Sequence, residues 1–345
     1  MAISDLPNRS ILVSALAVAL GLALAGLMAI LRGVAPGQAY TALLGAGFGC
    51  RAPESCGLVT TLQFATPLLF TGLSAGVAIR SGMFSLGQAG QMLLGAAAAG
   101  WVGARLEAPA WAQLPLAFAG GAAVGALWGG IPGALRAWLG VHEVIVTILL
   151  NQVAPLLVGF FGFSRIAATA RLAPLAGGSK LNAGLFLAVA AAGLMQLWFH
   201  RVGAGYAQRM QAEAPGFARY GGIPTRKAML GGMLISGALA GLGGAVEVLG
   251  VHYRLVGAFS GGGGFDGLAV AALGGFHPLG ITLAAGLLGG LRVGALNGLQ
   301  LQLRIPRELG NGMIAVMMLV VSLEALHRWL RRPGRPAPAS PPAPP

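Results

Sequence analysis

Long apolar runs alternate with short polar stretches along most of this chain. A transmembrane helix needs about 20 consecutive, predominantly apolar residues. Runs of that length predict membrane-spanning helices at residues 11–31, 57–79, 83–104, 108–135, 144–164, 181–199, 228–246 and 309–330. The pattern therefore predicts an all-α polytopic membrane protein.

The pattern is less regular between residues 255 and 303. A glycine run, SGGGG, occupies residues 260–264, and a short apolar piece that contains Asp266 follows it. Residues 278–303 are apolar apart from Arg292. Irregular backbone is tolerated at membrane depth only where it faces protein or a watery cavity. We therefore expect a broken or re-entrant segment near 255–280, and about ten transmembrane helices in all.

One long polar stretch, residues 201–227, interrupts the apolar part of the chain; we call it the basic island. Its only acidic residue is Glu213. Its basic residues are Arg201, Arg209, Arg219, Arg226 and Lys227. This bias is typical of cytoplasmic loops. Pro215 favours the first turn of a short helix, and Gly221 favours its end.

The distribution of arginines predicts that both termini are cytoplasmic, because Arg9 precedes the first span and an arginine cluster follows the last. The run at 11–31 is too long for a signal-peptide core, so we expect it to be retained as a span. The predicted organisation is a transmembrane domain at 1–330 and a disordered, Pro-rich cytoplasmic tail at 331–345.

The composition supports the membrane assignment and excludes other classes. The chain is 56% hydrophobic and 9% charged, whereas a soluble domain has about 25% charged residues. The net charge of +13 does not predict nucleic-acid binding, because the charges are scattered at the ends of apolar segments rather than gathered in one stripe.

No motif for catalysis or metal binding is present. The two lysines, Lys180 and Lys227, lie outside any G-x-x-x-x-G-K-[ST] sequence, and HExxH, CxxC and GxSxG are absent. The five histidines are dispersed without ligand spacing. We expect neither an enzyme nor a bound cofactor or metal in this chain.

The two cysteines, Cys50 and Cys56, lie in the loop between the first two predicted spans, on the side opposite the cytoplasm. That compartment is oxidising, which favours a small disulfide. Sequence spacing does not establish the Cα separation that a disulfide requires, so two free thiols remain the alternative.

Polar residues within the apolar segments are the candidate functional residues. Gln88 and Gln91 lie on one face of the third predicted span, Asn151 lies in the fifth, and Asp266 follows the glycine run. Such residues are candidates for a substrate path. Hydrogen bonding between helices is the alternative for the amides, and capping of the following helix is the alternative for Asp266.

Two further patterns concern helix packing. Glycines recur every four residues at 121–133 and again at 286–298, which places each series on one helix face. Close packing of helices is the expected role, and a dimer interface is the alternative. At the end of the seventh span, Glu247 is expected to pair with His252 or Arg254.

Several motifs, in this order, resemble the permease subunits of bacterial ABC importers for nucleosides and simple sugars, within the branched-chain-type permease family. The motifs are TPLLFTGLSAGVAIRSGMFSLGQAGQMLLGA (66–96), GVHEVIVTILLN (140–151), ARYGGI (218–223), SGALAGLGGAVEVLGVHYRL (236–255) and GFDGLAVAALGGFHPLG (264–280). The resemblance covers residues 57–325.

The resemblance implies a ten-helix permease in the bacterial plasma membrane that forms homo- or heterodimers. It also implies a cytoplasmic ATPase subunit that uses ATP and Mg²⁺, and an extracytoplasmic substrate-binding protein. The short helix in the basic island would couple the permease to the ATPase. The residues that match the coupling helix are Glu213, Pro215, Gly216, Phe217, Ala218, Arg219, Tyr220 and Gly221.

The chain departs from the family pattern at three places. Ala89 stands where the family has a carboxylate, Gly216-Phe217 replaces Glu-Ala, and Gln152 replaces Tyr. These departures bear on the substrate rather than on the class of transporter. Amides offer donors and acceptors to a neutral, hydroxyl-rich solute. The competing classes are a secondary transporter, coupled through buried carboxylates, and a channel for a small polar solute.

Overall fold

The computed structural model describes residues 33–50, 56–163, 169–175, 179–255 and 263–306, with isolated positions between 16 and 31 and at 312 and 315. Over these residues the fold is helical and contains no β-strand beyond two isolated bridges. About half of the predicted first span, nearly all of the last span at 309–330 and the whole tail at 331–345 lie outside the described residues.

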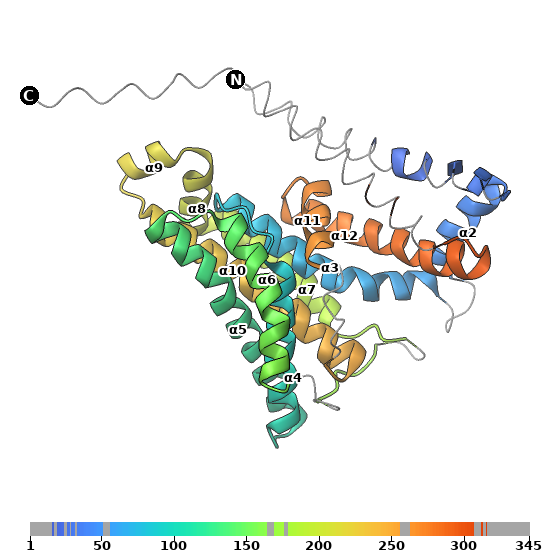
Figure 1. The fold of residues 1–345 in the computed structure, drawn as a ribbon, viewed down its shortest axis with the longest axis horizontal. Coiled ribbons are helices and arrows are strands. Elements are labelled where there is room, and N and C mark those ends of the chain that lie inside the picture. The colour runs from blue at the N-terminus through green and yellow to red at the C-terminus, as the bar shows by residue number, and fades with distance from the viewer. Residues whose placement is uncertain are drawn as a thin grey trace, which may run out of the picture.

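Most of the helices follow one another with short connections, and the longest connection joins α6 to α7 (Figure 1). They are α2 (Pro36–Phe48), α3 (Gly57–Arg80), α4 (Gln88–Arg105), α5 (Ala110–Leu139), α6 (Glu143–Phe160), α7 (Gly184–Arg201), α8 (Gly203–Glu213), α9 (Pro215–Tyr220), α10 (Thr225–Glu247), α11 (Gly263–Leu273) and α12 (Pro278–Val293), with the π-helical segments η4 (Val248–His252) and η5 (Gly294–Gln302).

Five helices in the described part are long and apolar enough to cross a membrane: α3, α5, α6, α10 continued by η4, and α12 continued by η5. A sixth candidate is α7 with α8, a pair bent by 76°. α4 covers most of the predicted span at 83–104 but is not among these candidates, because its two glutamines and many small residues lower its hydropathy. A multi-pass membrane protein is therefore confirmed, and the total of about ten helices stays a prediction.

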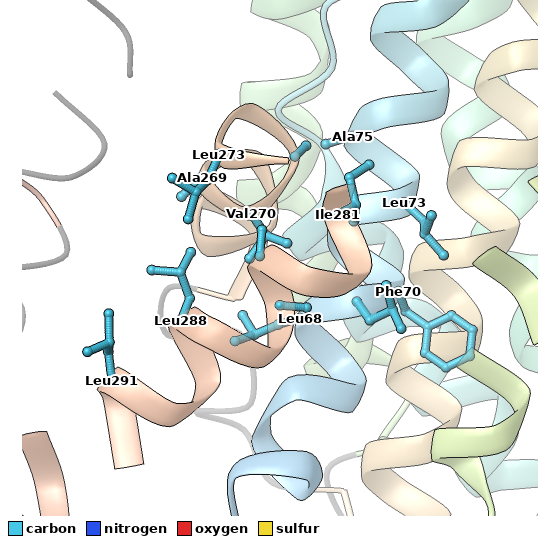
Figure 2. Packing of buried hydrophobic residues seen from close by; sticks show 14 of the residues in the cluster. Leu68, Phe70, Leu73, Ala75, Ala269, Val270, Leu273, Ile281, Leu288 and Leu291 are labelled. Atoms are coloured by element: carbon cyan, nitrogen blue, oxygen red, sulfur yellow. The ribbon is translucent and has the colours of Figure 1, made fainter. Parts of the chain in front are cut away.

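One hydrophobic cluster joins α3 to α11 and α12. Leu68, Phe70 and Leu73 of α3 belong to the same buried cluster as Val270 of α11 and Ile281 of α12 (Figure 2). α11 has only 11 residues, about half the number that crosses a bilayer. Packing against its neighbours therefore holds this short helix within the bundle.

The glycine series of α5 packs against α10. A side chain at Gly125 would collide with the backbone of Gly237, and a side chain at Gly241 would collide with the backbone of Gly121. In the second series, Gly294 and Gly298 approach the backbone of α2 in the same way. Both series therefore serve helix packing within the chain, which was the expected role, since small residues let helix backbones approach closely.

α8 and α9 lie together at one end of the bundle, next to the ends of α5 and α10 (Figure 1). The sequence predicted one short helix in the basic island, and α9 is that helix. The structure adds α8, which the polar composition concealed. Even the buried face of α8, which includes Gln208 and Gln211, is polar. The whole of α8 therefore lies within the polar stretch that defines the island.

Candidate functional site

Three polar residues of α6, Glu143, Thr147 and Asn151, are spaced four residues apart and therefore share one helix face. This face contacts residues 84–90, which form the end of the α3–α4 loop and the start of α4; we call them the 84–90 segment. Glu143 Oε1 accepts a hydrogen bond from the Phe84 N–H at 3.3 Å. Thr147 Oγ1 accepts one from the Leu86 N–H at 3.3 Å.

Asn151 uses both ends of its amide in this contact. Its Oδ1 accepts a hydrogen bond from the Gly90 N–H at 2.9 Å, and its Nδ2 donates one to the Leu86 carbonyl at 2.7 Å. This geometry favours interhelical bracing, the alternative role for Asn151, over direct contact with a solute. Asn151 holds the first turn of α4, on which Gln88 and Gln91 lie.

Gln88 and Gln91 are completely buried, with 0% and 1% of their surfaces exposed. Gln88 Nε2 donates to the Ser85 carbonyl at 3.0 Å. The Oε1 atoms of both glutamines lack a hydrogen-bond partner within the described part of the chain. A buried acceptor without a partner costs about 1–3 kcal/mol, so a protein retains such a group for a reason other than stability.

Trp128 of α5 joins this group, although the sequence analysis did not identify it. Its Nε1 is also buried and has no partner among the described residues. A Cβ placed on Gly90 would lie 3.1 Å from Trp128 Nε1 and 3.0 Å from Asn151 Oδ1, so the indole N–H reaches the same glycine as Asn151. We call Gln88, Gln91 and Trp128 the amide–indole cluster. In the sequence, only position distinguishes Trp128. It lies about two helix turns before Arg136, on the side of α5 that carries the glycine series.

Asp266 takes part in a different contact. Its carboxylate accepts a hydrogen bond from Arg292 of α12 and forms an ion pair with it. Asp266 lies in the first turn of α11 rather than at its N-cap, where a carboxylate interacts favourably with the helix dipole. The structure thus joins the two charged residues of the 260–303 region to each other and not to the amides.

The coupling residues expected from the resemblance all lie on or beside α9. Phe217 and Tyr220 are 65% and 95% exposed, whereas Ala218 is fully buried. The helix ends where the Gly221 N–H donates to the Phe217 carbonyl at 2.9 Å. Glu213, Gly216, Arg219 and Gly221 are exposed, and Pro215 is half-buried. α9 therefore presents aromatic and basic side chains outward while its alanine faces the protein.

Two pairings near the opposite ends of the helices also have sequence counterparts. The structure joins the sulfur atoms of Cys50 and Cys56. The disulfide stays a prediction, and labelling of free thiols in intact, unreduced cells would test it. Glu247 Oε2 lies 3.3 Å from His252 Nε2, one of the two partners expected for it.

Comparison with known proteins agrees with the resemblance. Residues 57–322 match the family described as "Branched-chain amino acid transport system / permease component". The guanosine ABC transporter permease protein NupP of Bacillus subtilis is 39% identical over 90% of this chain and 93% of its own length. The nucleoside ABC transporter permease protein NupB of Lactococcus lactis is 34% identical over 84% of each chain.

The glucose ABC transporter permease protein TsgB13 of Haloferax volcanii is 31% identical over 91% of this chain and 88% of its own length. No solved structure matches this chain. The family match covers α3 to η5 and therefore includes the amide–indole cluster and the basic island. The chain belongs to the family of permease components of branched-chain amino acid transport systems.

Proposed function

We propose that this chain is the permease subunit of an ATP-binding cassette importer and forms the translocation path for a nucleoside, with a simple sugar as the second candidate. Two of the relatives are named for guanosine or nucleosides and one for glucose. The observation that carries the proposal is the amide–indole cluster, because it places unpaired donor and acceptor atoms between α4 and α5 inside the helix bundle.

The chemistry of the cluster suits a neutral polar solute. The two Oε1 atoms accept hydrogen bonds and the indole N–H donates one. None of these groups is charged, so a solute can leave without breaking an ion pair. The cluster is near the cytoplasmic ends of the helices, since Asn151 is eight residues, or about 12 Å, from the start of α6. We place it in the inner half of the path.

Asp266 has a different proposed role. Its pairing with Arg292 neutralises the one intramembrane carboxylate of the 260–303 region, and a proton- or sodium-coupled transporter needs a carboxylate that is free to take up the cation. This pairing supports an ATP-driven importer over the secondary transporter or channel that the sequence left open. Asp266 would then stabilise the wall of the path through Arg292 rather than bind the solute.

The energy is proposed to come from a separate cytoplasmic ATPase that binds ATP and Mg²⁺, with no cofactor in this chain. An extracytoplasmic binding protein would deliver the solute. A second permease subunit, identical or related, would cover part of the faces of α5 and α6, of which only 22% is buried within the chain. We place the protein in the bacterial plasma membrane with both termini in the cytoplasm.

Transport by the reconstituted complex tests this function. Proteoliposomes containing the permease, its cognate ATPase and its binding protein should take up labelled guanosine in an ATP-dependent manner. Unlabelled nucleosides should compete, whereas ribose and glucose should compete less and leucine should not. ATP-dependent uptake of leucine alone would reject the nucleoside assignment while leaving the family intact, and uptake without ATP would reject the importer.

A further inference from the structure

A basic cleft with a volume of about 1300 Å³ opens on the surface that carries the basic island. Its walls come from the C-terminal end of α5, the end of α8, α9 and the start of α10. Four basic residues line it: Arg136, Arg219, Arg226 and Lys227. No acidic residue is among its lining residues in the described part of the chain.

Three of these four cations have no carboxylate partner within the described residues. Only Arg136 forms an ion pair, with its Nε 3.3 Å from Glu143 Oε2. Arg219, Arg226 and Lys227 are exposed. Like charges that converge on a concave surface produce a positive potential, which attracts an anionic partner and raises its rate of association.

The rim of the cleft indicates what kind of partner this is. Trp138 and Leu139, which line the cleft at the end of α5, are 50% and 71% exposed. On α9, Phe217 and Tyr220 do not line the cleft but are exposed close in sequence to the lining residue Arg219. Exposed aromatic side chains beside arginines are typical of the energetically dominant parts of protein–protein interfaces. The combination favours a protein with an acidic segment over a free anion.

We infer that the basic cleft receives an acidic segment of the cytoplasmic ATPase subunit. The ATPase interface would then extend beyond α9 to the C-terminal end of α5 and the start of α10. The inference rests on the proposed function, since it assumes an ATPase partner. The cleft and the coupling helix form one continuous surface, because Pro215 and Arg219 of α9 belong to both.

The cleft also has a connection into the bundle. Arg136 lines the cleft and pairs with Glu143, and Glu143 accepts the hydrogen bond from the Phe84 N–H. A partner carboxylate that reaches Arg136 competes with Glu143 for the guanidinium. A partner docked on Arg136 is therefore linked to the 84–90 segment through one residue, Glu143. The 84–90 segment in turn includes the first turn of α4.

Lys227 offers a direct test, because a carbodiimide joins a lysine amine to a carboxylate only when the two are in contact. In the assembled permease–ATPase complex, carbodiimide treatment should link Lys227 to an Asp or Glu of the ATPase, identified by mass spectrometry. Lys227→Arg keeps the charge and should abolish this link without weakening the complex. A link from Lys227 only to Glu213 of its own chain would overturn the inference.

Binding measurements provide the second test. Arg226→Gln with Lys227→Gln should weaken ATPase binding at least tenfold at low salt and reduce its salt dependence, since fewer charge pairs remain to be screened. Arg201→Glu is the matched control, because it changes the net charge by the same amount and Arg201 is an exposed residue of the basic island that does not line the cleft. Size-exclusion profiles and thermal midpoints of all variants should equal those of the wild type.

The outcomes separate the inference from the function on which it rests. If the Gln variant binds the ATPase as the wild type does, while Arg219→Glu with Tyr220→Ala does not, the cleft is no docking site and the coupling role of α9 survives. If ATPase binding is unchanged but the purified variant carries less phosphatidylglycerol than the wild type, the cleft binds lipid headgroups and the inference is wrong. If neither variant affects the ATPase, the coupling role fails as well.

Discussion

The polar face of α6 and the basic island differ in where their polar groups find partners. Glu143, Thr147 and Asn151 of α6 find partners within the chain, in the 84–90 segment and, for the second carboxylate oxygen of Glu143, in Arg136. The exposed cations of the island, such as Arg226 and Lys227, have no carboxylate partner in the part of the chain that the structure describes. The polar residues of α6 therefore stabilise the fold, whereas the exposed cations of the island remain available to bind another molecule.

This difference has an energetic consequence. Breaking a buried hydrogen bond leaves a donor or acceptor unsatisfied and costs about 1–3 kcal/mol. An exposed charge contributes about 0–1 kcal/mol to folding. Substitutions on α6 should therefore act on stability, and substitutions on the island should act on association.

The largest effect is expected at α9. Arg219→Glu combined with Tyr220→Ala removes a cation and the most exposed aromatic side chain of the helix. Residues of this type at the centre of an interface each contribute about 2 kcal/mol or more, so ATPase affinity should fall by at least about 30-fold and ATP-driven uptake should disappear. Membrane insertion and the thermal midpoint should not change. Normal co-purification of the ATPase and normal uptake would show that the island only fixes topology.

The second effect concerns Asn151. Asn151→Leu leaves the Gly90 N–H and the Leu86 carbonyl without their partner, so unfolding free energy should fall by about 2–4 kcal/mol. Thr147→Val removes the bond from the Leu86 N–H and the bond that the hydroxyl donates to the Val144 carbonyl within α6. Only the Leu86 N–H then lacks a partner from another helix, so the cost should be about half as large. Thermal unfolding in detergent measures both. A stable Asn151→Leu protein that no longer transports would instead place Asn151 in the substrate path.

Much of this fold could be predicted from the sequence, because each long apolar run has one low-energy arrangement in a membrane. The spans at 57–79, 108–135 and 228–246 each correspond to a helix of the structure. α8 was missed because its buried face carries glutamines, and amphipathicity is then invisible to a hydropathy count. The roles of polar residues were harder to predict, because a role depends on which helices meet.

The candidate site illustrates that limit. Sequence grouped Asn151 with Gln88 and Gln91 because all three are amides in apolar segments. The structure separates them by hydrogen bonding: Asn151 is satisfied, and the two glutamine Oε1 atoms are not. Trp128 carried no sequence signal of polarity, since one indole N–H is a small part of a large apolar side chain.

The third prediction tests the amide–indole cluster. Gln91→Leu removes an Oε1 that has no partner among the described residues, so the protein should be as stable as the wild type. Solute uptake should fall by about tenfold, the equivalent of one lost hydrogen bond of about 1.4 kcal/mol. Trp128→Phe removes the indole N–H and should have a similar effect on uptake. Wild-type uptake in both variants would show that the cluster serves packing alone.

The smallest effect concerns His277, which lies in the turn between α11 and α12. Burial lowers the pKa of His277, and the charges of Arg80 and His200 lower it further. The folded protein therefore binds a proton at His277 less readily than the unfolded chain does. The stability that this difference contributes is fully present above the unfolded pKa of about 6.5 and is lost as the pH falls below it.

His277→Gln should remove this part of the acid sensitivity. The thermal midpoint of the variant should fall less than that of the wild type between pH 7.5 and about 5.5, because that interval spans the unfolded pKa of about 6.5. The difference should be smaller than the effect of Asn151→Leu, since His277 is only half-buried and solvent screens its neighbours. His142→Gln, at the exposed N-cap of α6, controls for the substitution itself. Equal pH dependence in the wild type and His277→Gln would show that His277 is protonated as readily in the folded protein as in the unfolded chain.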